Sequence, residues 1–366
     1  MNTASTTLPE RATAQRLAGP DVVRAVALIG VVVMNYHGYL LLADARGPGR
    51  AGSGWAVELF DPWTGPLSTR FAATFVLVAG VGVSLMTASS IGTPRVTAMR
   101  WRLVRRGTLL YVSGLLLDVI WPGTILPFYG AMFVLAAAMF TWRARWIVVT
   151  GAAAAVAGWA IRMWRYDRDL AGLNTGWLTD PAAGTPADHL FGVTVNGTHP
   201  LLPWLAFFCA GMLLGRYLRT SWWRPVALGS GVALFSLAGL VSIGAATDYE
   251  RVLLSTLPLE RGLLYTVSAL GTSLIAYAVI DWLAVRFPVA TDPLRRAGQM
   301  TLTLYVAHVF VFKLLVDWVD VIDPAGVGTA VSFALAFWVV GIIAAGAWQR
   351  RLGIGPLERV YRVVGG

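Results

Sequence analysis

Ten apolar segments of 15 to 22 residues, nearly free of charge, dominate the sequence. A helix needs about 20 such residues to cross a bilayer, and it satisfies all its own backbone hydrogen-bonding groups there. We therefore expect an all-α, polytopic integral membrane protein with about ten transmembrane helices. The expected spans are residues 22–42, 71–88, 107–121, 125–142, 146–160, 201–218, 226–246, 263–283, 302–319 and 327–348.

The distribution of arginine predicts how these spans are oriented. With the N-terminus inside, the inward segments carry 19 arginines, whereas the outward segments carry 8 arginines and 12 acidic residues. Cytoplasmic loops of membrane proteins hold the excess of basic residues, so both termini are predicted to be cytoplasmic. The net charge of +10 then reflects membrane topology and does not indicate nucleic-acid binding.

The chain divides into a cytoplasmic N-terminal tail (1–20), a transmembrane domain (21–349) and a cytoplasmic C-terminal tail (350–366). The outward segments 43–70 and 161–200 exceed the about 12–15 residues of a simple connector, which predicts a functional role. A single cysteine, Cys209, lies in an apolar segment, so we expect neither an intramolecular disulfide nor a bound metal.

The first span carries polar residues along one stripe. At 100° per residue, Asn35 lies within about 20° and Asp21 within about 60° of Arg24 on a helical wheel. His37 lies about 220° from Arg24 and faces elsewhere. Ionisable groups in a span usually serve a function, although Asp21 and Arg24 forming an anchoring ion pair at the helix end is the plain alternative.

The ninth span carries a second polar set, with His308 near its middle. Lys313 and Asp317 are four residues apart and are predicted to pair. His308 has no carboxylate at helical spacing, and a hydrogen-bonded packing role remains the alternative for His37. The arginine run from Arg95 to Arg106 is either a topology signal or a receiver for a phosphorylated ligand.

Several stretches resemble one family of membrane enzymes when taken in order. They are residues 21–28 (DVVRAVAL) leading to Asn35-Tyr36, residues 75–85 (FVLVAGVGVSL), 121–130 (WPGTILPFYG), 199–216 (HPLLPWLAFFCAGMLLGR), 301–308 (TLTLYVAH) and 355–359 (GPLER). The chain resembles heparan-alpha-glucosaminide N-acetyltransferase and its bacterial relatives, and its end resembles the YeiB-like membrane proteins. It departs from the "D-x-x-R-G" form at Ala25, and residues 38–188 contain no histidine.

The resemblance implies a multi-pass acyltransferase of a bacterial cytoplasmic (inner) membrane. It would move an acyl group, usually acetyl, from cytoplasmic acyl-CoA to a hydroxyl or amine of an extracytoplasmic, sugar-like acceptor. No metal is implied, and the acceptor, the acyl chain, direct transfer against an acyl-enzyme, and a homodimer stay open.

The resemblance also suggests roles for the polar residues. Arg24, with Asp21, Arg105 and Arg106, would bind the coenzyme A phosphates. Asn35 or Tyr36 would donate to the thioester oxyanion, and His37 or His308 would be the general base, with His37 favoured. A further expectation is that outward tryptophans stack on the acceptor: Trp55, Trp63, Trp164 and Trp177.

Two other function classes fit the same polar spans. A transporter or flippase for a small or lipid-linked substrate uses buried polar residues and broken helices too, although the inverted repeats common in transporters are not apparent. A non-catalytic membrane interaction protein is the third hypothesis. Acyl-CoA hydrolysis or acyl transfer by the purified protein separates the first class from the other two.

Overall fold

The computed structural model describes residues 17–44, 54–323 and 325–366. These residues form helices and connecting turns, with no β-strand among them. Most of the predicted N-terminal tail (residues 1–16) and residues 45–53 of the predicted outward segment 43–70 lie outside the described part.

The long helices are α1 (Gly19–Asp44), α3 (Arg70–Thr87), α4 (Val96–Asp118), α5 (Leu126–Met139), α6 (Ala144–Leu170), α9 (Leu201–Tyr217), α10 (Trp223–Ile243), α12 (Leu263–Arg286), α13 (Pro288–Gly298), α14 (Thr301–Phe312), α15 (Gly326–Leu352) and α16 (Pro356–Gly365). The short ones are α2 (Trp55–Leu59), η1 (Ala88–Ser90), α7 (Gly176–Thr179), α8 (Pro186–Phe191), η2 (Gly192–Asn196), α11 (Asp248–Leu253), η3 (Pro258–Glu260) and η4 (Lys313–Trp318).

Each of the ten predicted spans coincides with a helix, and seven of these helices are long and apolar enough to cross a membrane: α1, α3, α6, α10, α12, α14 with η4, and α15. The bent pair of α8–η2 and α9 raises this to eight if it forms one broken span. Helix α4 carries four arginines in its first half, and α5 has only 14 residues. The multi-pass, all-helical class is thus confirmed for the described residues, and the count of ten stays a prediction.

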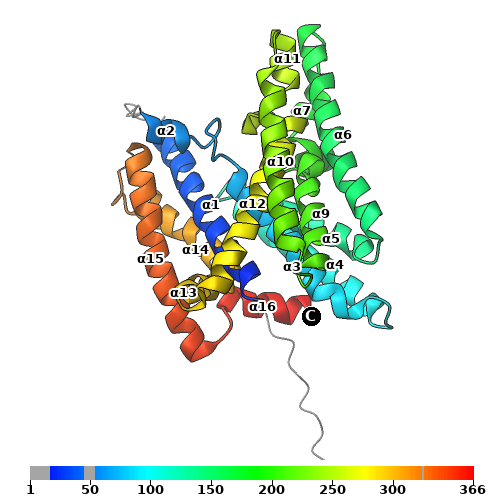
Figure 1. Cartoon of the computed structure of the whole chain (residues 1–366). Coiled ribbons are helices and arrows are strands. Elements are labelled where there is room, and N and C mark those ends of the chain that lie inside the picture. Colours follow the sequence, from blue (N-terminus) through cyan, green and yellow to red (C-terminus); the bar gives the residue numbers. More distant parts are fainter. Residues whose placement is uncertain (1–16, 45–53, 324) are drawn as a thin grey trace, which may run out of the picture.

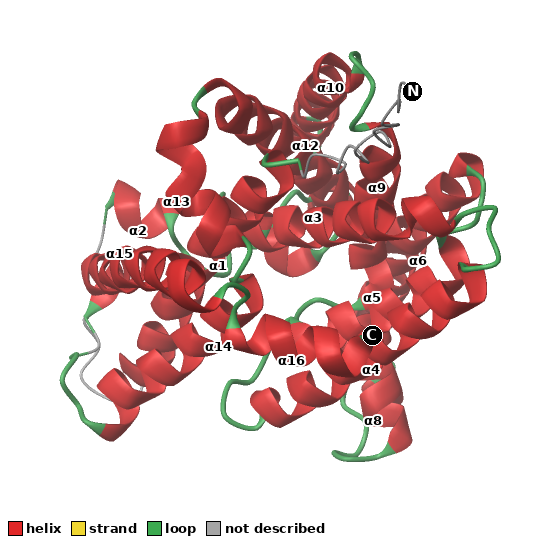
Figure 2. Ribbon diagram, turned by 90° about the horizontal axis from the view of Figure 1, so that it is seen from below, coloured by secondary structure: helices red, strands yellow, loops and turns green. Residues whose placement is uncertain are grey.

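Helix α1 occupies the middle of the bundle (Figure 1). It packs against α3, α12, α13, α14 and α15, so the polar stripe predicted on it meets several neighbours. The amphipathic helix α16 lies across the end of the bundle at which α1 begins, against α4 and α14 (Figures 1 and 2). The beginning of α1 and the C-terminal helix therefore share one end of the molecule.

Helices α3 and α9 pack with their backbones in contact, next to the central helix. A Cβ atom built on Gly80 would lie 2.1 Å from the carbonyl oxygen of Phe208, and one on Gly211 would lie 1.9 Å from that of Leu77. Helices in lipid associate through such small residues because burying apolar side chains gains little there. This contact fixes the wall of α3 that faces the candidate site.

Candidate active site

An inner cavity of about 260 Å³ lies at the end of the bundle where α1 begins and α16 crosses. Three arginines line it, each from a different helix: Arg24 from α1, Arg106 from α4 and Arg362 from α16. The one carboxylate among its lining residues, Glu358, is already bound to α14. The cavity therefore has a positive character and suits an anionic ligand.

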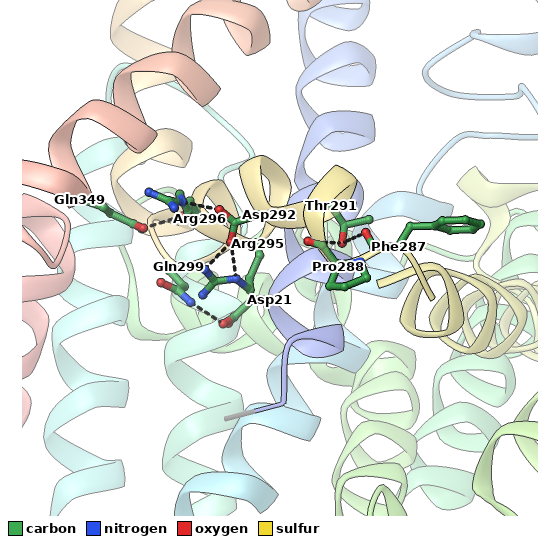
Figure 3. Close-up of polar contacts among 9 residues, drawn as sticks. All are labelled: Asp21, Phe287, Pro288, Thr291, Asp292, Arg295, Arg296, Gln299 and Gln349. Carbon is green, nitrogen blue, oxygen red and sulfur yellow. Dashed lines mark hydrogen bonds and ion pairs between the residues drawn. The ribbon is translucent and has the colours of Figure 1, made fainter. Parts of the chain in front are cut away.

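Arg24 is held at the cavity wall by the neighbouring acid and by α13. Its Nη1 atom lies 3.2 Å from Oδ1 of Asp21 and 3.5 Å from the carbonyl oxygen of Gly298. Oδ2 of Asp21 accepts a hydrogen bond of 3.1 Å from Nε2 of Gln299 (Figure 3). The anchoring ion pair, which the sequence left as the plain alternative to a functional role, is present, and its contacts hold the start of α1.

A neighbouring group of polar contacts ties α13 to α15. Asp292 pairs with Arg295 and with Nε of Arg296 at 2.6 Å, and Gln349 of α15 donates to the carbonyl oxygen of Arg296 at 2.8 Å (Figure 3). The hydrogen bond from Arg295 holds the pKa of the Asp292 carboxyl below its usual range. Helix α13 is therefore a rigid support for the start of α1.

Helix α16 is fastened over the inner cavity by Glu358. Its carboxylate accepts hydrogen bonds from the backbone N–H of Thr303 (3.0 Å) and from its hydroxyl (2.6 Å). The N–H of Thr303 belongs to the first turn of α14, where backbone donors lack partners inside the helix. A Cβ atom on Gly355 would lie 2.1 Å from Glu358 Oε2, so a side chain there would displace the carboxylate from its position. Two residues of the GPLE stretch thus attach α16 to α14.

An outer cavity of about 360 Å³ lies further along α1. Its lining includes Asn35 and Tyr39 of α1, Trp63 of the segment before α3, and His199 and Arg261 of two other connections. Four tryptophans were expected to stack on a sugar. Of these, Trp63 alone lines the outer cavity. Trp164 and Trp177 instead pack edge to face with ring centres 6.2 Å apart.

The turn that carries Trp63 is organised by Asp61. Oδ1 of Asp61 accepts hydrogen bonds from the backbone N–H groups of Trp63 (2.9 Å) and Thr64 (2.6 Å). Partial burial raises the pKa of the Asp61 carboxyl, but these hydrogen bonds outweigh it and leave the pKa below its usual range. The charged carboxylate thus stabilises the wall of the outer cavity.

Tyr305 of α14 lines both the inner and the outer cavity. No other described residue lines both. Its side chain is buried, and its hydroxyl lies 2.9 Å from Oγ1 of Thr124 and 3.1 Å from the backbone nitrogen of Ile125. The two cavities therefore approach each other at one side chain in the middle of the bundle.

Asn35 and His308 connect α1 to α14 beside the outer cavity. Nδ1 of His308 bonds to the carbonyl oxygen of Tyr305, and because a carbonyl only accepts, Nδ1 carries the proton. Nε2 is then an acceptor, and Nδ2 of Asn35 donates to it at 3.3 Å. The imidazole thereby fixes the orientation of the Asn35 amide, whose second N–H stays available.

Comparison with family models matches residues 16–247 to "Heparan-alpha-glucosaminide N-acetyltransferase, catalytic". The chain belongs to this family. Residues 207–365 match a second model, "Protein of unknown function (DUF418)". No curated protein matches the chain. The family together with the apolar helices makes the chain a multi-pass membrane protein of acyltransferase type.

In this member of the acetyltransferase family, all four predicted donor-binding residues lie at the end of the bundle that holds the inner cavity. Arg24 and Arg106 line the inner cavity. Asp21 is buried behind Arg24, and Arg105 is exposed on the surface of α4 beside the cavity. The predicted pair of Lys313 and Asp317 is present at 2.6 Å, away from both cavities.

Three of the four predicted catalytic residues do not line either cavity. The hydroxyl of Tyr36 donates to the carbonyl oxygen of His308 at 3.0 Å, and its ring stacks on Phe333. Nδ1 of His37 lies 2.6 Å from the carbonyl oxygen of Phe60, on a different face from Asn35, as the helical wheel predicts. His308 lies behind Asn35, which alone among the four reaches the outer cavity.

Four residues that line the cavities were not predicted as site residues from the sequence: Tyr305, His199, Arg261 and Glu358. Tyr305, His199 and Glu358 lie in stretches already recognised as family-like, so attention to those motifs could have found them. Arg261 gave no such signal. It has a left-handed backbone with φ of 49°, which is strained for a residue with a side chain, and it donates to the carbonyl oxygen of Gly197 at 2.6 Å.

Proposed function

We propose that the protein transfers an acetyl group from acetyl-coenzyme A, bound in the inner cavity, to a hydroxyl or amine of a sugar-like acceptor in the outer cavity. The observation that carries this proposal is the pair of cavities that share Tyr305, of which the inner one is lined by three arginines and the outer one by a single arginine and a histidine. The inner end, with α16 and both chain ends of the described bundle, would face the cytoplasm of a bacterial cell, in keeping with the arginine distribution.

The inner cavity suits the narrow part of such a donor. Its volume of about 260 Å³ is below the about 300–1,000 Å³ typical of pockets that enclose whole drug-sized ligands. The acyl-pantetheine arm would therefore enter the cavity while the nucleotide stays at its mouth. Arg24, Arg106 and Arg362 would contact the phosphates there, because a guanidinium matches phosphate oxygens with paired N–H groups.

The outer cavity supplies the groups needed on the acceptor side. His199 is the one histidine of the described residues that lines it, which makes it the best-placed general base. The acceptor oxygen or nitrogen would attack the thioester carbonyl carbon, the C–S bond would break, and the acceptor proton would pass through the base to the departing coenzyme A thiolate. The products are the acetylated acceptor and coenzyme A.

Asn35 would stabilise the oxyanion that forms during this attack. Asn35 lines the outer cavity, and the hydrogen bond to His308 fixes how its amide group is oriented there. A preorganised donor of this kind typically contributes about 10²–10³ in rate. His308 would thus be a positioning residue that acts through Asn35.

Purified protein in neutral detergent tests the proposal. Release of free coenzyme A thiol from acetyl-CoA is followed with and without glucosamine, and the acetylated sugar is identified by mass. Asn35→Ala serves as the impaired variant and Asp317→Asn, far from both cavities, as the matched control. Absence of thiol release together with sugar uptake into proteoliposomes would instead support the transporter hypothesis.

A further inference from the structure

Tyr305 lies between the inner and the outer cavity and lines both of them. Its ring lies where they approach each other, and only about 3% of its surface is exposed. A ligand group that enters from the inner end therefore meets this side chain before it reaches Asn35.

The hydroxyl of Tyr305 is held by the connection between α4 and α5. Ile125 directly precedes α5, so its N–H has no partner inside the helix, and the tyrosine oxygen accepts from it at 3.1 Å. The phenolic hydroxyl also forms a hydrogen bond of 2.9 Å with Oγ1 of Thr124. The ring is thus fixed at its far end as well as at α14.

The connection itself is braced on both sides. Oδ1 of Asp118 accepts from the backbone N–H groups of Gly123 (2.8 Å) and Thr124 (3.3 Å). On the α1 side, the ring of Tyr39 stacks on Trp121 with centres 3.6 Å apart, and its hydroxyl bonds to the carbonyl oxygen of Pro122. A rigid connection leaves the tyrosine side chain as the element that can move.

We propose that Tyr305 is a gate: its side chain closes the passage between the inner and outer cavities when its hydroxyl is bonded to Thr124 and Ile125. Breaking those two bonds lets the ring swing aside and joins the cavities. Combined with the proposed function, on which this last step rests, the thioester carbonyl reaches Asn35 only past the displaced ring. The closed gate keeps the donor away from the acceptor side when no transfer occurs.

Cysteine accessibility tests the gate without any need for acyl transfer. In a Cys209→Ser background, Thr301→Cys places one thiol in the lining of the inner cavity. Proteoliposomes with purified, uniformly oriented protein are treated with a small charged methanethiosulfonate reagent from one side at a time. With Tyr305 present, we expect labelling from the α16 side only. With Tyr305→Ala, labelling from the opposite side should rise to match it.

Tyr129→Ala is the matched control. Tyr129 is a buried tyrosine that lines the inner cavity and not the outer one, so its removal enlarges the inner cavity and leaves the gate intact. Labelling should then stay one-sided. Two-sided labelling in both variants would overturn the proposal, as would two-sided labelling with Tyr305 present.

A gentler variant covers the case in which Tyr305→Ala fails to fold. Tyr305→Phe keeps the ring and removes the hydroxyl, so the closed position loses its two hydrogen bonds. Labelling from the far side should rise about fivefold or more, because the loss of even one of these two hydrogen bonds changes a population by about that factor. An unchanged rate would overturn the gate. One-sided labelling without any acetyl transfer would retain the gate and remove the proposed function.

Discussion

The amide nitrogen of Asn35 lies 3.3 Å from Nε2 of His308, and these residues are 273 positions apart in the sequence. The contact joins the middle of α1 to the middle of α14. Because the Tyr305 carbonyl sets the tautomer of the imidazole, the bond has a defined direction, with Asn35 as the donor. One helix thus carries the polar group toward the outer cavity, and the other decides how that group points.

We predict that replacing His199 lowers turnover the most among the histidines near α1. His199→Gln should reduce kcat by about 10²–10⁴, the usual contribution of a positioned general base, while coenzyme A binding is retained. His37→Gln should leave kcat close to normal, because the His37 ring bonds to Phe60 and lines neither cavity. Single-turnover acetyl transfer measures all variants.

His308→Gln provides the discriminating comparison. Loss of the imidazole frees Asn35 to rotate, so kcat should fall while KM for the acceptor changes little. A double variant, Asn35→Ala with His308→Gln, should then be no slower than Asn35→Ala alone. If His37→Gln proves the slowest variant, the base assignment favoured by the sequence holds and His199 has another role.

We predict that Arg24→Lys weakens coenzyme A binding by about tenfold or more. Hydrogen bonds to charged groups contribute about 1.5–3 kcal/mol, and a lysine cannot reproduce the paired donors of a guanidinium. Calorimetric titration of the purified protein with coenzyme A measures the change. Arg105→Lys is the control, because Arg105 is exposed and outside the lining of the inner cavity. Equal losses in both variants would point to general charge attraction.

We predict that the α16 end of the bundle faces the cytoplasm. In a Cys209→Ser background, Ala183→Cys should label from outside intact cells with an impermeant maleimide, because this exposed residue lies in the predicted outward segment 161–200. Ser221→Cys, exposed in the connection between α9 and α10, should label only after permeabilisation. The reverse pattern would invert the orientation, and with it the donor side.

Apolar segment length is what made the fold accessible from the sequence. A span needs only about 20 apolar residues and internal backbone bonding, so all ten predicted segments coincide with helices. The shared face of Asp21 and Arg24 and the direction of His37 also followed, because both depend on the rotation within one helix. The ion pair between Asp21 and Arg24 was only the alternative to a functional role.

The site depended on contacts between helices, and a single sequence does not encode these in a local pattern. Asn35 meets His308, and Tyr305 meets Thr124, across the bundle. Glu358 was noticed only as part of a motif, because its target on α14 lies 55 residues earlier. The choice between His37, His199 and His308 as a base likewise needed the cavity, which forms from five or more separate elements.

We predict that Glu358 keeps α16 closed over the inner cavity. Glu358→Ala removes both acceptors from Thr303 and leaves an N–H of the first turn of α14 without a partner. Loss of hydrogen bonds to a charged group destabilises by about 1.5–3 kcal/mol, which loosens the attachment of this short helix to α14. Trypsin should then cut faster at Arg359 and Arg362, and coenzyme A affinity should fall because Arg362 leaves the cavity.

Thr303→Val separates this attachment from a general loss of stability. It removes the hydroxyl but keeps the backbone N–H, so α16 should be released only in part, with cleavage rates between those of the original chain and Glu358→Ala. Gly355→Ala should resemble Glu358→Ala, because its Cβ atom would displace the carboxylate from Thr303. Thr303→Val and Gly355→Ala leave the arginines of the inner cavity unchanged. If coenzyme A affinity falls in step with the rise in cleavage rate in these two variants, the loss of affinity comes from the displacement of α16. Unchanged cleavage in Glu358→Ala would show that the GPLE stretch does not attach this helix.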